Sequence, residues 1–143
     1  MLFSGSAKTE VTSERQHATK LLFVCSRNRK RSLTAEKLME GVPGYEARSA
    51  GTQPGARIVV TEGHIGWADI VFVMEKSHLA KLRSRFPEAL VGKQIIALHI
   101  PDDYEFMQPE LLDELRARLD SFVVFLTRAG LTSEDRVFQR PTG

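Results

Sequence analysis

Hydrophobic and polar positions alternate in blocks along this chain, and the blocks predict a repeated strand–helix order. Three continuous apolar runs have the length of strands that are buried on both faces, and a fourth, mixed segment is compatible with a strand. The apolar runs are residues 21–24, 70–74 and 95–98, and the mixed segment is 45–49. Four strands are therefore expected.

Apolar residues at helical spacing predict three helices, two of them between predicted strands and one after the last strand. The stripes are Ala35, Leu38 and Met39; Leu79, Leu82 and Phe86; and Leu111, Leu115, Leu119, Phe122 and Leu126. Gly41 and Pro87 mark the ends of the first two helices, and Pro109 suits the first turn of the third. Residues 56–67 are ambiguous, because Gly63 and Gly66 weaken a helix there.

This order predicts an α/β fold, a single three-layer domain in which helices flank a four-stranded parallel sheet. We expect the domain to span residues 20–127, between a flexible N-terminal arm (1–19) and a C-terminal tail (128–143). Ligands of such sheets bind beyond the carboxyl ends of the strands. Cys25 follows the first strand, and residues 99–104 follow the fourth.

Composition and charge narrow the possible functions. The 143 residues are 42% hydrophobic and 27% charged with a formal charge of +2, which does not favour a nucleic-acid partner. No apolar run is long enough to cross a bilayer, and the single cysteine suits a reducing compartment, so a cytoplasmic protein is expected. The four histidines lack metal-ligand spacing, and neither a metal nor a cofactor is expected.

The segment Cys25–Ser32 is the chemically distinctive one, lying between a buried strand and a helix. Such a loop can wrap backbone N–H groups around a phosphate, while the helix N-terminus adds partial positive charge. Arg31 offers a fork for two phosphate oxygens, and Asn28 is a residue type that accepts a left-handed backbone. The positive field favours the thiolate of Cys25, to which Ser32 can donate a hydrogen bond.

We therefore predict that Cys25 is a nucleophile, with Arg31 as a second catalytic residue. The residues predicted to bind the phosphate are Ser26, Arg27, Asn28, Arg29, Lys30 and Ser32. A cysteine at a strand end is more often a buried, inert residue. The surrounding strand, asparagine, Arg-Ser pair and helix favour the chemical interpretation.

From about residue 21 to about residue 122 the chain resembles the low-molecular-weight protein tyrosine phosphatase family. The matching segments are residues 23–25, Asn28, residues 31–32, residues 35–36, residues 49–52 and residues 68–74. The resemblance implies a four-stranded parallel sheet, no metal and a phosphocysteine intermediate on Cys25. The chain departs from the family pattern at Arg27, where glycine is usual, and at Lys30, where a second cysteine is frequent.

The resemblance also implies a general acid late in the chain, where the sequence reads Pro101-Asp102-Asp103-Tyr104. Asp102 would protonate the leaving phenol and then act as base on the water that hydrolyses the phosphocysteine. Tyr104 would form an aromatic wall for the substrate ring. Because the family's proline after the acid is missing, Asp103 remains an alternative.

The expected function is hydrolysis of phosphotyrosine-type monoesters, in a protein or a small aryl phosphate, with inorganic phosphate as product. The charges of Arg27, Arg29 and Lys30 either favour acidic phosphopeptides and polyanions or form a solvated basic loop. Two other functions stay open. One is an arsenate reductase that uses an external thiol, and the other is a catalytically weak member that binds phosphate or polyanions.

Overall fold

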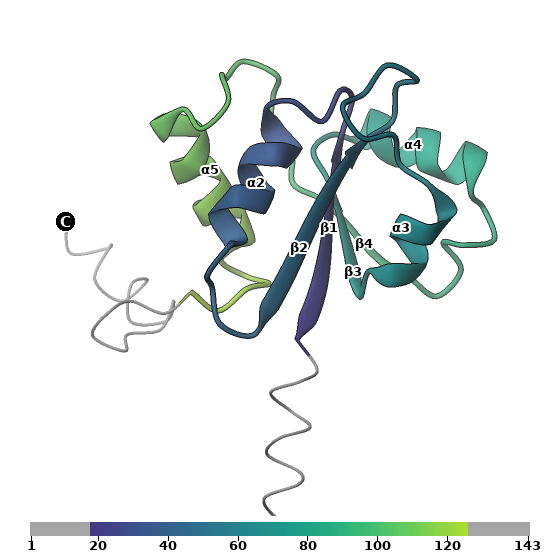
Figure 1. The fold of residues 1–143 in the computed structure, drawn as a ribbon, viewed down its shortest axis with the longest axis horizontal. Coiled ribbons are helices and arrows are strands. Elements are labelled where there is room, and N and C mark those ends of the chain that lie inside the picture. Colours follow the sequence, from purple (N-terminus) through teal and green to yellow (C-terminus); the bar gives the residue numbers. More distant parts are fainter. Residues whose placement is uncertain (1–17, 126–143) are drawn as a thin grey trace, which may run out of the picture.

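Four parallel strands form the centre of the structure, a computed structural model that describes residues 18–125 (Figure 1). The strands are β1 (Thr19–Cys25), β2 (Tyr45–Gly51), β3 (Ile70–Val73) and β4 (Gln94–Ala97), in the order β2-β1-β3-β4. The helices are α2 (Arg31–Met39), α3 (Glu62–Trp67), α4 (Lys76–Arg85) and α5 (Pro109–Leu119). The predicted fold class is confirmed, and α3 resolves the ambiguous segment as a short helix.

The predicted terminal segments fall almost entirely beyond the part of the chain that the structure describes. Residues 1–17 of the expected arm and the whole expected tail, 128–143, lie outside it. Within residues 18–125, none of the helices is long and apolar enough to cross a membrane.

Alternation along β1 supplies two hydrophobic cores at once. Successive strand residues face opposite sides of a sheet. Leu21 and Phe23 therefore join the core that contains residues of α2 and α5, while Leu22 and Val24 join the core that contains residues of α3 and α4. Figure 1 shows these two helix pairs on opposite sides of the sheet. The apolar run 21–24 is continuous because both faces are covered.

β1 occupies a central position in the sheet, and this fixes where its last residue lies. It pairs with β2 on one side, so that Cys25 is opposite Gly51, and with β3 on the other. The rings of Phe23 and Phe72 stack across the β1–β3 pair with centroids 5.3 Å apart. Cys25 thus ends a strand that is buried from Leu21 onward, at the carboxyl edge of the sheet where ligands of this fold class bind.

The last helix is shorter than its apolar stripe predicted. α5 ends at Leu119, so the expectation that Phe122 continues the helical face is wrong, and Leu126 lies outside the described residues. Beyond the helix, Val123 and Phe125 still join the first core, and the N–H of Val124 donates to the hydroxyl of Tyr45 at 3.0 Å. Valines are weak helix formers, and in this stretch burial is achieved without a helix.

Candidate active site

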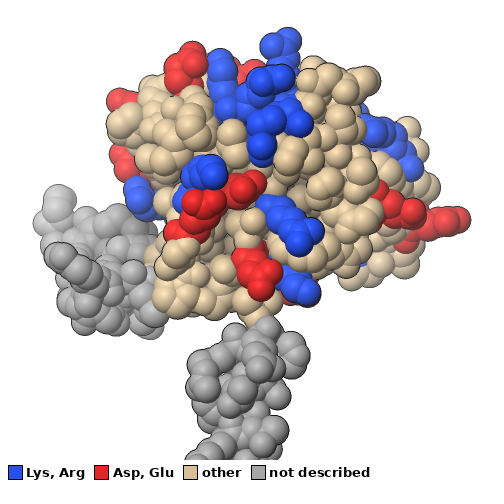
Figure 2. All heavy atoms as spheres, in the orientation of Figure 1, with Lys and Arg blue, Asp and Glu red and all other residues tan. Residues whose placement is uncertain are grey.

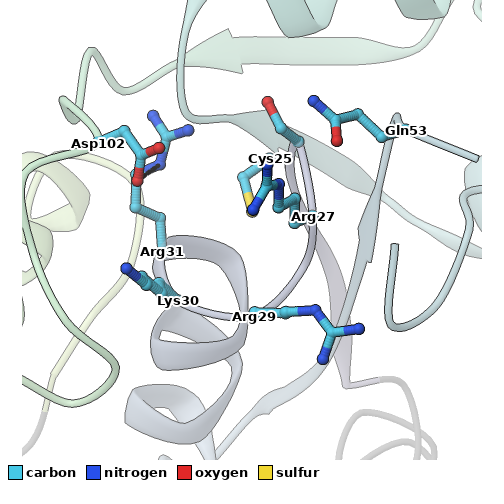
Figure 3. A pocket seen from close by; sticks show the side chains of 8 residues that line it. Cys25, Arg27, Arg29, Lys30, Arg31, Gln53 and Asp102 are labelled. Carbon is cyan, nitrogen blue, oxygen red and sulfur yellow. Dashed lines mark ion pairs between the residues drawn. The ribbon is translucent and has the colours of Figure 1, made fainter. Parts of the chain in front are cut away.

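A cavity of about 290 Å³ opens at the carboxyl edge of the sheet, beside the start of α2 (Figure 3). Cys25 lies in the middle of the view, with Asp102 to one side and Gln53 to the other. The lining residues are Cys25, Ser26, Arg27, Arg29, Lys30, Arg31, Gln53 and Asp102. Most of the predicted site residues are thus brought together around one cavity.

The backbone of the loop between β1 and α2 is held from outside by residues 52–57. The carbonyl groups of Cys25, Ser26 and Arg27 accept hydrogen bonds from the N–H groups of residues 52, 53 and 57, at 2.9, 3.0 and 2.9 Å. The carbonyl of Asn28 accepts from Nε of Arg57 at 3.1 Å. Asn28 has a φ of 58°, in the left-handed region that its residue type accepts. Because these carbonyl groups are already bound, an anion in the cavity is expected to meet N–H groups.

Two hydrogen bonds converge on the sulfur of Cys25. The backbone N–H of Asn28 points to Sγ at 3.3 Å, and Oγ of Ser32 lies 3.0 Å from Sγ. Ser32 also accepts a hydrogen bond from Nδ2 of Asn28 at 2.8 Å, which leaves its own proton for the sulfur. Both groups can donate a hydrogen bond to the sulfur when it carries negative charge.

Asn28 and Ser32 were predicted to bind the phosphate, but both are fully buried and neither lines the cavity. Their side chains therefore do not face the cavity, and binding of a phosphate by these two residues stays a prediction. Oγ of Ser32 contacts the sulfur, and Nδ2 of Asn28 donates a hydrogen bond to that Oγ. Both side chains can influence a bound anion through Cys25.

Arg31 enters the cavity with one edge of its guanidinium already bound. The residue is 3% exposed, and its Nη1 donates both to the carboxylate of Glu75 and to the carbonyl of Ile100, the latter at 2.8 Å. These two bonds use the protons of Nη1. The Nε–H and Nη2–H edge remains for a bidentate grip on an oxyanion. In the structure Nε lies 3.7 Å from the carboxylate of Asp102 (Figure 3).

His78 joins the loop to the start of α4 through both ring nitrogens. Nδ1 accepts a hydrogen bond from the N–H of Glu75 at 3.0 Å, so the proton of the neutral ring is on Nε2. Nε2 lies 3.0 Å from Oγ of Ser26 and is therefore the donor of that bond. Burial, and then the positive charge of Arg31, lower the pKa of His78 to about 4. The neutral imidazole leaves the Ser26 hydroxyl proton available to the cavity.

The two acidic candidates for proton transfer occupy different surroundings. Asp102 lines the cavity, whereas Asp103 is not among the lining residues. The segment that carries them is fixed at both ends. The N–H of Ile100 donates to the carbonyl of Met74 at 2.9 Å, and the N–H of Met107 donates to Oγ1 of Thr34 at 3.0 Å.

The aromatic wall predicted for Tyr104 is not formed. Tyr104 does not line the cavity, because its side chain packs against the core between the sheet and the helices α2 and α5. Trp67, another aromatic residue, does not line the cavity either. It packs against the second core, and the guanidinium of Arg48 lies 4.2 Å above its ring. The lining thus contains no aromatic side chain within the described residues.

Basic side chains surround the mouth of the cavity. Arg27, Arg29 and Lys30 are exposed, and all three line it. Figure 2 shows Lys and Arg side chains gathered at the end of the molecule where the strands finish. Lys30 lies 3.4 Å from the carboxylate of Glu105, which follows the segment that carries Asp102.

Three residues of the site were not predicted from the sequence: Gln53, Glu75 and His78. Glu75 and His78 lie at the start of α4, shortly beyond β3, which also ends at the carboxyl edge of the sheet. The rule that ligands bind beyond strand ends therefore contained the signal that could have identified them. The same rule applies to Gln53, which lies just beyond the end of β2 at that edge.

By sequence, the chain matches neither a protein-family model nor a curated protein. By structure, it is similar to the tyrosine phosphatase Wzb from Escherichia coli K30, solved with phosphate (TM-score 0.61, 24% identity, 73% of this chain and 96% of that one). It is also similar to the YwlE arginine phosphatase from Geobacillus stearothermophilus (TM-score 0.58, 23% identity, 87% and 96%).

A third similar structure is the low molecular weight protein tyrosine phosphatase from T. tengcongensis (TM-score 0.57, 23% identity, 72% of this chain and 96% of that one). These likenesses confirm that the fold is the one implied by the resemblance in the sequence.

The substitution Gly51→Ala tests whether close packing at the end of β2 holds the loop between β1 and α2 in place. A Cβ at this position would lie 2.5 Å from the carbonyl oxygen of Ser26 and 2.6 Å from Cβ of Ala56, so Gly51→Ala must displace the loop. We expect the free energy of unfolding to fall by about 1–3 kcal/mol, with weaker binding of phosphate or vanadate. Gly55→Ala is the matched control, since a Cβ there meets no atom within 4 Å. Equal behaviour of the two variants in urea unfolding and anion binding would contradict this account.

His78 predicts a defined pH dependence of stability. Its pKa is about 4 in the folded chain and about 6.5 in an unfolded one, so the unfolded state binds more protons between these values. The free energy of unfolding therefore has its full value above pH 6.5. It falls by roughly 3 kcal/mol as the pH drops to 4, at about 1.4 kcal/mol per pH unit. When the free energy of unfolding is measured with urea at several pH values, His78→Asn should remove this part of its dependence on pH. A His78 that titrates near pH 6.5 by NMR would overturn the assignment.

Proposed function

We propose that this protein is a cysteine-dependent phosphatase that hydrolyses phosphotyrosine-type monoesters through a phosphocysteine on Cys25. The observation that carries the proposal is the pair of hydrogen bonds on Sγ, from the backbone of Asn28 and from Ser32. Both groups can donate to a negatively charged sulfur in a cavity that Arg31 also lines. A fold shared with solved tyrosine and arginine phosphatases supports the same reaction class.

The reaction begins when the phosphate of the substrate binds to the loop N–H groups and to the Nε/Nη2 edge of Arg31. Sγ of Cys25 attacks phosphorus, and the bond between phosphorus and the phenolic oxygen breaks. Asp102 gives its proton to that oxygen, so that a neutral phenol leaves. A thiophosphate bond to Cys25 is the result.

In the second step a water molecule attacks phosphorus, and the Asp102 carboxylate takes one of its protons. The bond between sulfur and phosphorus breaks, inorganic phosphate is released and the thiolate returns. Ser32, 3.0 Å from Sγ, stabilises the sulfur as its negative charge reappears. The cycle needs neither a metal nor an oxidant.

Cys25→Ser tests the nucleophile. Turnover of phenyl phosphate and of a phosphotyrosine peptide should fall by about three orders of magnitude or more, since the covalent step is lost. Rapid acid quenching of the wild type followed by peptide mass spectrometry should find phosphate on Cys25. If the wild type is no faster than Cys25→Ser yet binds phosphate, the non-enzymatic binding function is the correct one. Faster turnover of phosphoarginine than of phosphotyrosine would show that the substrate class is phosphoarginine and not phosphotyrosine.

Asp102→Asn and Asp103→Asn form a matched pair for the general acid. With phenyl phosphate, whose leaving phenol has a pKa of about 10, Asp102→Asn should lower kcat by about a hundredfold or more. Asp103→Asn should change kcat less than about twofold, because Asp103 does not line the cavity. The steady-state rates of both variants decide the assignment, and the reverse order would transfer the role to Asp103.

A further inference from the structure

Cations outnumber anions around the cavity. Its lining contains Arg27, Arg29, Lys30 and Arg31, against Asp102 as the single carboxylate among the described residues. The same lining contains no aromatic or aliphatic side chain. An apolar group attached to the scissile phosphate would therefore meet only the carbon atoms of these polar side chains, while a charged group would also meet their cations.

Two of these four cations already have partners. Arg31 is bound by Glu75, and Lys30 is paired with Glu105. Arg27 and Arg29 differ from them, because both are exposed and no ion pair joins either one to another residue within positions 18–125. Their guanidinium groups remain available to a ligand.

The scissile phosphate alone does not account for these two free cations. Its charge is met by the loop N–H groups, the start of α2 and the free edge of Arg31. The cavity of about 290 Å³ corresponds to about ten water molecules at about 30 Å³ each, which leaves room beyond one phosphoryl group. Guanidinium forks bind carboxylates and phosphates in a bidentate way. Arg27 and Arg29 thus offer a place for a second anion at the cavity mouth.

We propose that Arg27 and Arg29 form a second anion subsite, so that the preferred substrate carries a carboxylate or phosphate beside its scissile phosphate. This inference rests on the proposed phosphatase function and adds the substrate class. Selectivity arises from charge at the mouth of the cavity, in place of the aromatic wall that Tyr104 does not provide.

The test compares two phosphotyrosine peptides that differ only in the residues beside phosphotyrosine, glutamates in one and glutamines in the other. For the wild type, kcat/KM should be about five- to tenfold higher with the glutamate peptide, as expected for two exposed ion pairs. The ratio should decline as sodium chloride is added, because salt screens exposed charges. In the double variant Arg27→Gln/Arg29→Gln the ratio should fall to about one.

A charge-matched control separates the subsite from the overall field of the protein. Arg83→Gln/Arg116→Gln removes two positive charges from exposed positions on α4 and α5, neither of which lines the cavity. This variant should keep the wild-type ratio. A wild-type ratio of one, or a ratio that survives in Arg27→Gln/Arg29→Gln, would overturn the proposal.

Binding measurements test the second anion subsite independently of the phosphatase activity. Calorimetry with inorganic phosphate and pyrophosphate needs no turnover, and pyrophosphate supplies the second anion in a small molecule. The wild type should bind pyrophosphate about five- to tenfold more tightly than phosphate, and Arg27→Gln/Arg29→Gln should lose most of this difference. If the wild type binds pyrophosphate tightly but hydrolyses neither phosphotyrosine peptide, the subsite stands and the phosphatase function is wrong. Equal binding of the two anions would remove the subsite, whatever the activity.

Discussion

The buried charge of Arg31 is the interaction on which the arrangement of the site depends. Arg31 is the first residue of α2, yet its partners come from beyond β3, through Glu75, and from beyond β4, through the carbonyl of Ile100. A buried guanidinium without a partner costs several kcal/mol, so these segments must come together when the chain folds. Because two bonds hold Nη1, the remaining edge is oriented before any ligand arrives.

The first turn of α4 both caps its own helix and holds the loop between β1 and α2. Glu75 and His78 bind each other at the first turn of the helix, and each also holds one residue of the loop, Arg31 and Ser26 respectively. The tautomer of His78 is fixed by the helix end, which in turn decides the direction of the hydrogen bond to Ser26. Helix capping and ligand-site geometry are therefore one set of contacts, and a change in either affects the other.

The parts of the structure that could be predicted from sequence are those that short-range patterns control. The apolar runs identified the strands, and the order Cys-x5-Arg-Ser between a strand and a helix identified the loop. The strand-end rule could have placed Glu75 and His78 near the loop, but not the particular contacts they make, since Glu75 is 44 positions from Arg31 and His78 is 52 positions from Ser26.

Two errors have the same physical origin. Tyr104 was expected in the cavity from its position in a motif, but packing against the core determines where its ring lies. The helical stripe was extended to Phe122, although α5 ends at Leu119 and the following residues are buried without a helix. In both cases tertiary packing prevailed over the local pattern.

The surroundings of the sulfur have a consequence for oxidative damage. Cys25 is the chain's one cysteine, and the groups that contact its sulfur are a serine hydroxyl and a backbone amide. If peroxide converts the thiolate to a sulfenic acid, no disulfide can form within the molecule to halt further oxidation. Recovery then requires a thiol from outside, and without one the sulfur proceeds to irreversible acids. If Cys25 is the nucleophile proposed above, the protein's activity thus depends on the reducing capacity of its surroundings.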